Sequence, residues 1–200
     1  MTYFWTDNLT SGTSPRDPKR QYRFIVELNG LENGASWYAK SVTKPSMTIS
    51  DTAHTYLNHK FYYPGRVDWS PINVTLVDPV SPDAAAETFK IIQAAGYRIP
   101  GDTDTTPGSE NLLTISKTTA VGRLGGVTIR QIDAEGVDLE TWTLRNPFIT
   151  SVNLGDLNYE SDGLSTVTLG IRYDFATCVT LNASTIGTET TNEFFKVPGS

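Results

Sequence analysis

Short segments in which apolar and polar residues alternate, each closed by a turn-forming residue, recur along most of this 200-residue chain. A period of two places successive side chains on opposite faces of the backbone, which is typical of half-buried β-strands. A chain of this length can bury one sizeable core or at most two small ones. We therefore predict one antiparallel β domain, with strands at 21–28, 35–42, 47–49, 57–63, 72–77, 127–132, 138–144, 148–154 and 164–175.

Helix signals occur after the predicted strand at 72–77. Ser81 is placed to cap the N-terminus of a helix, and Gly96 is placed to end it. Phe89 and Ile92 fall on one side of this segment together with its alanines, so that side is expected to pack against the sheets. The fold class predicted is an antiparallel β-sandwich or partial barrel with one flanking α-helix.

Segments without periodicity surround and interrupt this domain. Residues 1–20 are predicted to form an N-terminal arm, and residues 177–200 a polar C-terminal extension. The β domain is assigned to residues 21–176, with a loop insertion at 98–126 that is rich in Gly, Thr and Asp. A loop of this length usually has a function of its own or is mobile.

Charge is distributed unevenly along the chain. Through Arg66 there are eight basic and five acidic residues, whereas from Val67 onward there are eight basic and seventeen acidic ones. Affinity for DNA phosphates comes from clustered Lys and Arg, so this chain is a poor candidate for gripping DNA. The acidic part is either a solvated surface that keeps the protein soluble, or the lining of a passage through which a polyanion slides.

The sequence has few features of a membrane, secreted or metal-binding protein. No apolar run approaches the ~20 residues that span a bilayer, and the N-terminus lacks the order of a secretory signal. Cys178 is the only cysteine, so we expect a buried thiol and a reducing compartment. His54 and His59 have no further nitrogen or sulfur ligands at zinc spacing. We expect a soluble protein made inside the cell, without a metal or cofactor.

Catalytic patterns are also missing. No Gly-x-Ser-x-Gly elbow or phosphate-binding loop is found, and neither histidine has an obvious orienting partner. Asp133, Glu135, Asp138 and Glu140 offer carboxylates for a glycosidase pair, but acids that alternate across a hairpin usually face solvent. We therefore expect that the protein is not an enzyme.

The aromatic run Phe61-Tyr62-Tyr63 is the least ordinary feature of the chain. Strand geometry places Phe61 and Tyr63 on one face and Tyr62 on the other, and Pro64-Gly65 is predicted to form the turn that follows. At most part of the cluster can face one core. The cluster is therefore either core packing within one subunit or a surface for another protein.

Several stretches, in this order, resemble the tail tube proteins of contractile-tailed, T4-like bacteriophages. The resemblance runs from about Tyr22 to Ala176, and its individual motifs are weak, but their order and the helix after the strand at 72–77 fit together. The stretches are Tyr22–Leu28, Ser41–Ser46, Phe61–Arg66, Trp69–Ile72, Leu144–Val152, Leu157–Tyr159 and Ile171–Asp174.

The resemblance implies a structural virion protein of the phage tail, assembled in the cytoplasm of the host bacterium. Its subunits would form homo-hexameric rings that stack into the inner tube of a contractile tail. The partners implied are other copies of the chain, the sheath protein, the baseplate tube initiator and the tail terminator. The tape-measure protein and phage DNA would pass through the lumen without specific binding, and DNA would be ejected along it into the host.

Two sets of site residues follow from this resemblance. Phe61, Tyr62 and Tyr63 are candidate inter-subunit contacts, on a segment expected to project from the domain and dock on a neighbour. Asp138 and Glu140 are candidate lumen-facing acids, because strict alternation places both on one face, opposite Leu139.

Three other interpretations remain open. The chain is alternatively a tube-initiating baseplate protein with the same fold, or the tube of a phage-derived injection system whose cargo is protein. In a different class, it is a carbohydrate-binding β-sandwich with Trp37, Trp69 or Trp142 as a stacking platform.

Overall fold

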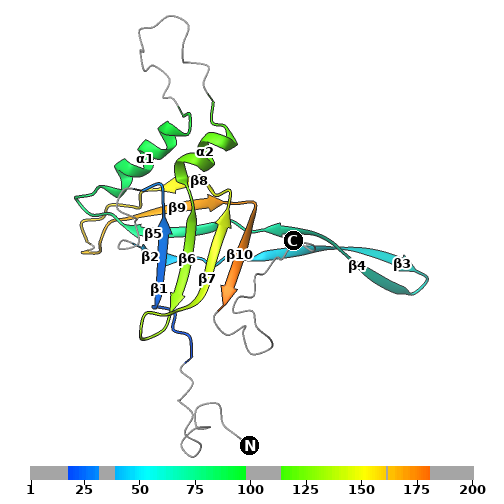
Figure 1. Ribbon diagram of the computed structural model, residues 1–200. Coiled ribbons are helices and arrows are strands. Elements are labelled where there is room, and N and C mark those ends of the chain that lie inside the picture. Colours follow the sequence, from blue (N-terminus) through cyan, green and yellow to red (C-terminus); the bar gives the residue numbers. More distant parts are fainter. Residues whose placement is uncertain (1–17, 32–38, 98–113, 161, 181–200) are drawn as a thin grey trace, which may run out of the picture.

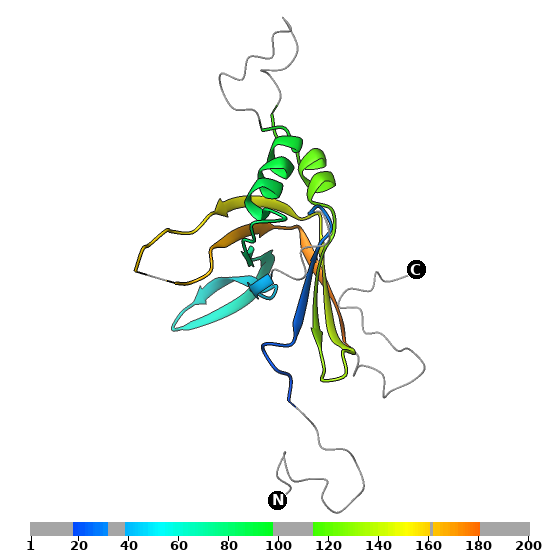
Figure 2. The same cartoon turned by 90° about the vertical axis from the view of Figure 1, so that its left-hand side faces the viewer.

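Two four-stranded antiparallel sheets form the body of the protein in the computed structural model, which describes residues 18–31, 39–97, 114–160 and 162–180. The strands of one sheet cross those of the other, and the sheets form two layers (Figures 1 and 2). Sheet A contains, in spatial order, β1 (Phe24–Leu28), β6 (Val127–Ile132), β7 (Asp138–Arg145) and β10 (Phe175–Thr180). Sheet B contains β2 (Ala39–Val42), β5 (Ile72–Val77), β9 (Thr166–Arg172) and β8 (Phe148–Asn153).

The core lies between these sheets and is built from alternate positions of the central strands. In β5, Ile72, Val74 and Leu76 are fully buried while Asn73 is exposed. β6 and β9 show the same alternation, and each apolar side chain buried in this way contributes about 1.5–3 kcal/mol. The predicted mainly-β antiparallel sandwich is confirmed, and the described part of the chain forms no closed barrel.

Helix α1 (Ala84–Ala94) confirms the predicted flanking helix, with two local corrections. Its N-cap is Asp83, whose carboxylate accepts a hydrogen bond from the Ala86 amide at 2.8 Å, rather than Ser81. The buried face consists of Ala84, Thr88 and Ile91, and Phe89 is 48% exposed, contrary to the prediction. The helix ends before Gly96, as predicted; Gly96 has φ 115°, a conformation that glycine adopts without strain.

A second helix was missed. α2 (Lys117–Leu124) lies within the segment 98–126 that was predicted to be a loop, and residues 98–113 of that segment are outside the described residues. Ser116 caps its N-terminus by accepting a hydrogen bond from the Thr119 amide, and Leu124 is buried. The two helices lie side by side at one end of the sandwich (Figures 1 and 2). In the part of the chain that the structure describes, no helix is long and apolar enough to cross a membrane.

The end of the domain also differs from the prediction. The predicted strand at 164–175 is shorter, and a further strand, β10, continues to Thr180 at the edge of sheet A. Cys178 is buried in β10 as a free thiol, which confirms the expected buried cysteine. The polar extension predicted from residue 177 therefore begins inside a strand, and its remainder, 181–200, lies outside the described residues, as do residues 1–17 of the predicted arm.

Candidate assembly surface

A long two-stranded hairpin projects from the sandwich (Figure 1). It is formed by β3 (Met47–Tyr56) and β4 (His59–Trp69), and every residue of the two strands except Trp69 is exposed. Strands of 10 and 11 residues reach about 33–36 Å at about 3.3 Å per residue. A two-stranded ribbon without further packing is at best marginally stable in water, so this hairpin has the form of an element completed by another surface.

The hairpin reverses direction at Leu57-Asn58, not at Pro64-Gly65 as predicted. Pro64-Gly65 instead lies inside β4, where the register shifts between Ile49 and Asp51. Ser50 occupies this irregularity, and its hydroxyl accepts a hydrogen bond from the Arg66 amide at 2.9 Å. A side chain at Gly65 would collide with Ser50, which explains the glycine without a turn.

Phe61, Tyr62 and Tyr63 all lie on the projecting hairpin, with exposed fractions of 46%, 64% and 58%. Within the described part of the chain, these three side chains therefore do not pack in the core of their own subunit. The ring of Phe61 has a local partner in His59, with a T-shaped contact and ring centroids 4.8 Å apart. The aromatic cluster is an exposed apolar surface, and such surfaces mark contact sites.

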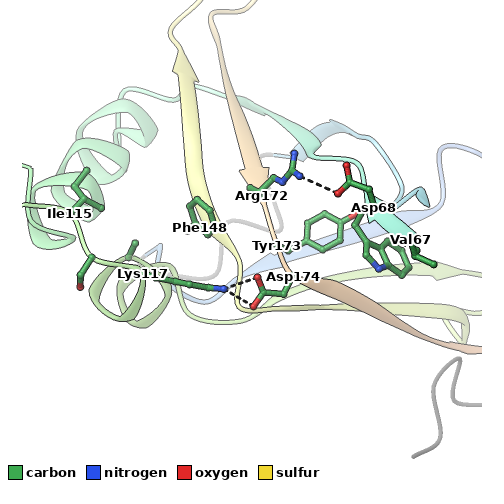
Figure 3. A pocket seen from close by; sticks show the side chains of 11 residues that line it. Val67, Asp68, Ile115, Lys117, Phe148, Arg172, Tyr173 and Asp174 are labelled. Carbon is green, nitrogen blue, oxygen red and sulfur yellow. Dashed lines mark hydrogen bonds and ion pairs between the residues drawn. The ribbon is translucent and has the colours of Figure 1, made fainter. Parts of the chain in front are cut away.

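The base of the hairpin adjoins an open hollow of about 510 Å³ (Figure 3). Trp69 and Tyr173 line it and pack against each other, with ring centroids 6.0 Å apart. Two ion pairs lie at its edge: Arg172 to Asp68 at 3.3 Å, and Lys117 to Asp174 at 2.7 Å. The second pair joins α2 to the β9–β10 corner. Because these charges are paired internally, we interpret the hollow as a structural joint.

Glu140 lies on the core side of sheet A, which corrects the expectation that it faces a lumen. It pairs in the sheet with the buried Gln131 and is only 12% exposed. Lys44 reaches from the end of β2 to donate to both residues, at 2.9 Å to Glu140 and 2.8 Å to Gln131. Lys19 donates to the other Glu140 oxygen at 2.7 Å, and the Trp142 indole donates to the same carboxylate.

This cluster sets the protonation of Glu140. Burial opposes ionisation, but the hydrogen bonds from Lys19, Lys44 and Trp142 outweigh it and lower the pKa of this carboxyl from 4.5 to about 2. Glu140 is therefore a carboxylate at neutral pH that joins sheet A to the end of β2 and to the segment before β1.

Asp138 lies on the opposite side of sheet A from Glu140. The register between β6 and β7 shifts at this point, so that Ile132 pairs with Asp138 and Gln131 with Glu140, leaving Leu139 as an extra residue. Asp138 consequently shares the outer face with Arg130, which contacts it at 3.5 Å and also contacts Glu27 at 2.5 Å. Strict alternation was the basis for grouping Asp138 with Glu140, and the bulge removes that basis.

Sheet A has two open edges among the described residues, β1 on one side and β10 on the other. The hairpin projects on the side of β10, and the connection between β8 and β9 lies at the opposite end of the molecule, on the side of β1 (Figure 1). Unpaired edges carry free backbone donors and acceptors that can pair with another chain.

Other kinds of site find little support in the described residues. They contain no group of three or more His, Cys, Asp or Glu side chains that could hold a metal ion. Trp69 is 7% exposed and the Trp142 indole is bonded to Glu140, so neither is a flat exposed platform for a sugar. Trp37 lies outside the described residues.

The fold has been seen in contractile particles. No protein-family model matches the chain, and no curated protein matches it in sequence. A chain from the cap that terminates the tube of the anti-feeding prophage has a TM-score of 0.61 and 17% identity, over 86% of this chain and 99% of that one. A chain from the extended sheath–tube complex of an extracellular contractile injection system, PVC, has a TM-score of 0.58 and 16% identity, over 82% and 92%.

A chain from the sixfold-symmetrised baseplate of the anti-feeding prophage gives a similar result, with a TM-score of 0.58 and 15% identity over 84% of this chain and 99% of that one. At these identities the likeness establishes the fold. The protein thus shares its fold with chains from terminator, sheath–tube and baseplate assemblies of contractile injection systems, and these structures do not single out T4-like phages.

Proposed function

We propose that this chain is a structural subunit that closes into homo-hexameric rings, which stack into the inner tube of a contractile particle. The observation that carries the proposal is the match to nearly the full length of chains from such particles, one of them in a sixfold-symmetrised assembly. The two different edges of sheet A support it, because a head-to-tail contact between unlike surfaces generates a ring when its rotation closes.

The partners and place of action belong to the same proposal. Copies of the chain would contact the sheath outside the tube, an initiator at the baseplate and a terminator at the far end. The tube would be assembled in the bacterial cytoplasm and carried in the tail, with tape-measure protein and then phage DNA passing through its lumen. Of the two acids first considered for the lumen wall, only Asp138 lies on an outer face and remains a candidate.

Purified protein at increasing concentration, with and without short tube fragments as seeds, tests this function. Negative-stain images and sedimentation are expected to show hollow sixfold rings or tubes, at least in the seeded samples. A strict monomer at every concentration, in both conditions, would contradict the proposal. A soluble monomer without seeds would not, because nucleation of a ring stack is slower than its growth.

A terminator or baseplate ring is the second candidate, favoured by the cap and baseplate assemblies among the structural matches. Counting the chain in purified particles by quantitative mass spectrometry separates the two, since a tube needs many rings and a terminator or initiator needs one. The same particles distinguish a phage tail from an injection system: the first carries a DNA-filled head, and the second carries protein cargo.

A further inference from the structure

The connection between β8 and β9 is a second exposed apolar surface. Leu157 and Tyr159 are almost entirely exposed, at 94% and 110%, and Leu164 is 73% exposed. Residues 155–159 and 163–166 line an open hollow of about 780 Å³. Between 154 and 165 the chain carries Asp156, Glu160 and Asp162 and no Lys or Arg, so this apolar surface is acidic.

The outer part of the hairpin has the complementary character. Residues 52–63 contain no Asp or Glu, and they carry Lys60 and two histidines. Tyr56 and Leu57 are exposed at 64% and 83%, in addition to the three aromatics from Phe61 to Tyr63. One surface is thus apolar and basic, and the other is apolar and acidic. Such pairs of surfaces select each other and speed encounter.

The two surfaces cannot meet within one subunit. They lie at opposite ends of the molecule in Figure 1, and Figure 2 shows that both project from sheet B. When copies are arranged head to tail, with β10 of one facing β1 of the next, the hairpin of the first extends toward the β8–β9 connection of the second. A contact of this kind is heterologous, so it repeats around a ring.

We propose that the hairpin tip, residues 52–63, docks on the β8–β9 connection of a neighbouring copy, with Tyr62 in the hollow and Lys60, on the same face of β4, among the three acids. The inference rests on the proposed function, because it names the partner surface through which the copies associate.

Cysteine cross-linking tests the direction of the contact. Tyr62→Cys and Leu157→Cys are introduced singly and together, and the native Cys178 is buried. After assembly and treatment with a short bis-maleimide, the double variant is expected to give a ladder of covalent oligomers, whereas each single variant stays monomeric. A dimer from Tyr62→Cys alone would mean that hairpins pair with each other and would overturn the proposal, as would the absence of a ladder from assembled double variant.

Charge reversal tests the proposed attraction between Lys60 and the acidic residues of the β8–β9 connection. Lys60→Glu, and separately Glu160→Lys, are expected to raise the protein concentration needed for half-maximal assembly by about tenfold, and combining them is expected to restore it. Glu135→Lys, a reversal of an exposed acid on the β6–β7 turn, is the matched control and should leave assembly unchanged. Equal effects from Glu160→Lys and Glu135→Lys would reduce the result to net charge and overturn the proposal.

These outcomes are separable from the fate of the proposed function. If the wild-type chain forms rings or tubes and the Glu160→Lys and Leu157→Cys variants behave as the controls do, the docking surface is wrong and the tube function stands. If the wild-type chain never associates, seeded or unseeded, both are wrong.

Discussion

Glu140 shows how one charged residue can hold two sheets together. Its carboxylate is 12% exposed and bonded to two lysines from different segments and to Trp142. Removing its charge leaves two partly desolvated ammonium groups without a counter-ion, so Glu140→Gln is expected to lower the free energy of unfolding by about 1–3 kcal/mol. Urea unfolding at pH 7 measures this, and Glu135→Gln on the exposed β6–β7 turn should stay within about 0.5 kcal/mol of wild type. Equal stabilities for the two variants would rule out a structural role for the cluster.

The same residue predicts a pH dependence. The pKa of Glu140 is about 2 in the folded protein against 4.5 for the free group, so its contribution is complete above pH 4.5 and is lost as the pH falls toward 2. Over that window the wild type should lose up to about 3 kcal/mol more stability than Glu140→Gln, an upper limit because water partly screens the cluster. Parallel stability–pH curves for the two proteins would contradict this.

At the scale of elements, the turn after β1 determines how closely α2 approaches the sandwich. A Cβ at Gly30 would meet the carbonyl oxygens of Arg123 and Leu124, the latter at 2.6 Å, and neither backbone group can move alone. Gly30→Ala is therefore expected to cost about 2–4 kcal/mol. A Cβ at Gly122, within α2, would meet nothing within 4 Å, so Gly122→Ala should be neutral or stabilise by up to about 1 kcal/mol. Thermal melts of both variants check the pair, and similar melting temperatures would contradict the close approach.

Sequence patterns found the elements with large buried side chains and missed those without them. The predicted strands at 72–77 and 127–132 coincide with β5 and β6, whose buried alternate positions are Val, Leu or Ile except for Gln131 in β6. β10 buries only Ala176 and Cys178, and its threonines resemble a polar tail. α2 contains Thr, Val and Gly, which are poor helix formers, although Ser116 and Gly125 mark its two ends in the expected way.

The sequence predicted which aromatic residues belong to the candidate assembly surface, but not how the strands that carry them are arranged. Alternation identified Phe61 to Tyr63 as strand residues that one core cannot cover, and they are exposed. It failed at Leu139, one of the register shifts in the sheets, because an extra residue reverses the faces of the residues beyond it and leaves no mark in a period of two. Asp138 and Glu140 were placed on one face for this reason, whereas the turn expected at Pro64-Gly65 was inferred from the dipeptide itself, which lies inside β4.

At the scale of the whole molecule, the hairpin and the sandwich are separable. Of the two hairpin strands, only Trp69, at the base of β4, belongs to the core cluster, so replacing residues 52–63 by Asn-Gly should leave a folded monomer with a melting temperature within about 3 °C of wild type. The same variant should fail to form rings or tubes. Circular dichroism and negative-stain microscopy measure the two properties, and a collapsed melt would place the hairpin within the folding unit.

The point substitution Tyr62→Asp should also impair assembly without affecting the fold of the monomer, and it leaves the hairpin in place. A carboxylate on an exposed strand costs the monomer little, whereas at a buried contact between copies it costs several kcal/mol. We expect an unchanged melt and no assembly. Thr52→Asp, on β3 opposite Tyr63, controls for the effect of a new charge on the stability of the hairpin itself. Assembly of Tyr62→Asp at wild-type concentrations would exclude this tyrosine from the contact.

The exposure of the whole hairpin also has a consequence for how the sequence of this segment can evolve. Substitutions at its outer, exposed positions should change the stability of the monomer little. They should instead change the affinity for the surface on which the hairpin docks. Under the proposed docking, selection on this segment acts on the hairpin tip and its receiving surface together, so the tip can diverge between two lineages while the sandwich stays the same. Two related particles built in one cell would then be kept from mixing their subunits by a few side chains that no measurement on the isolated monomer detects.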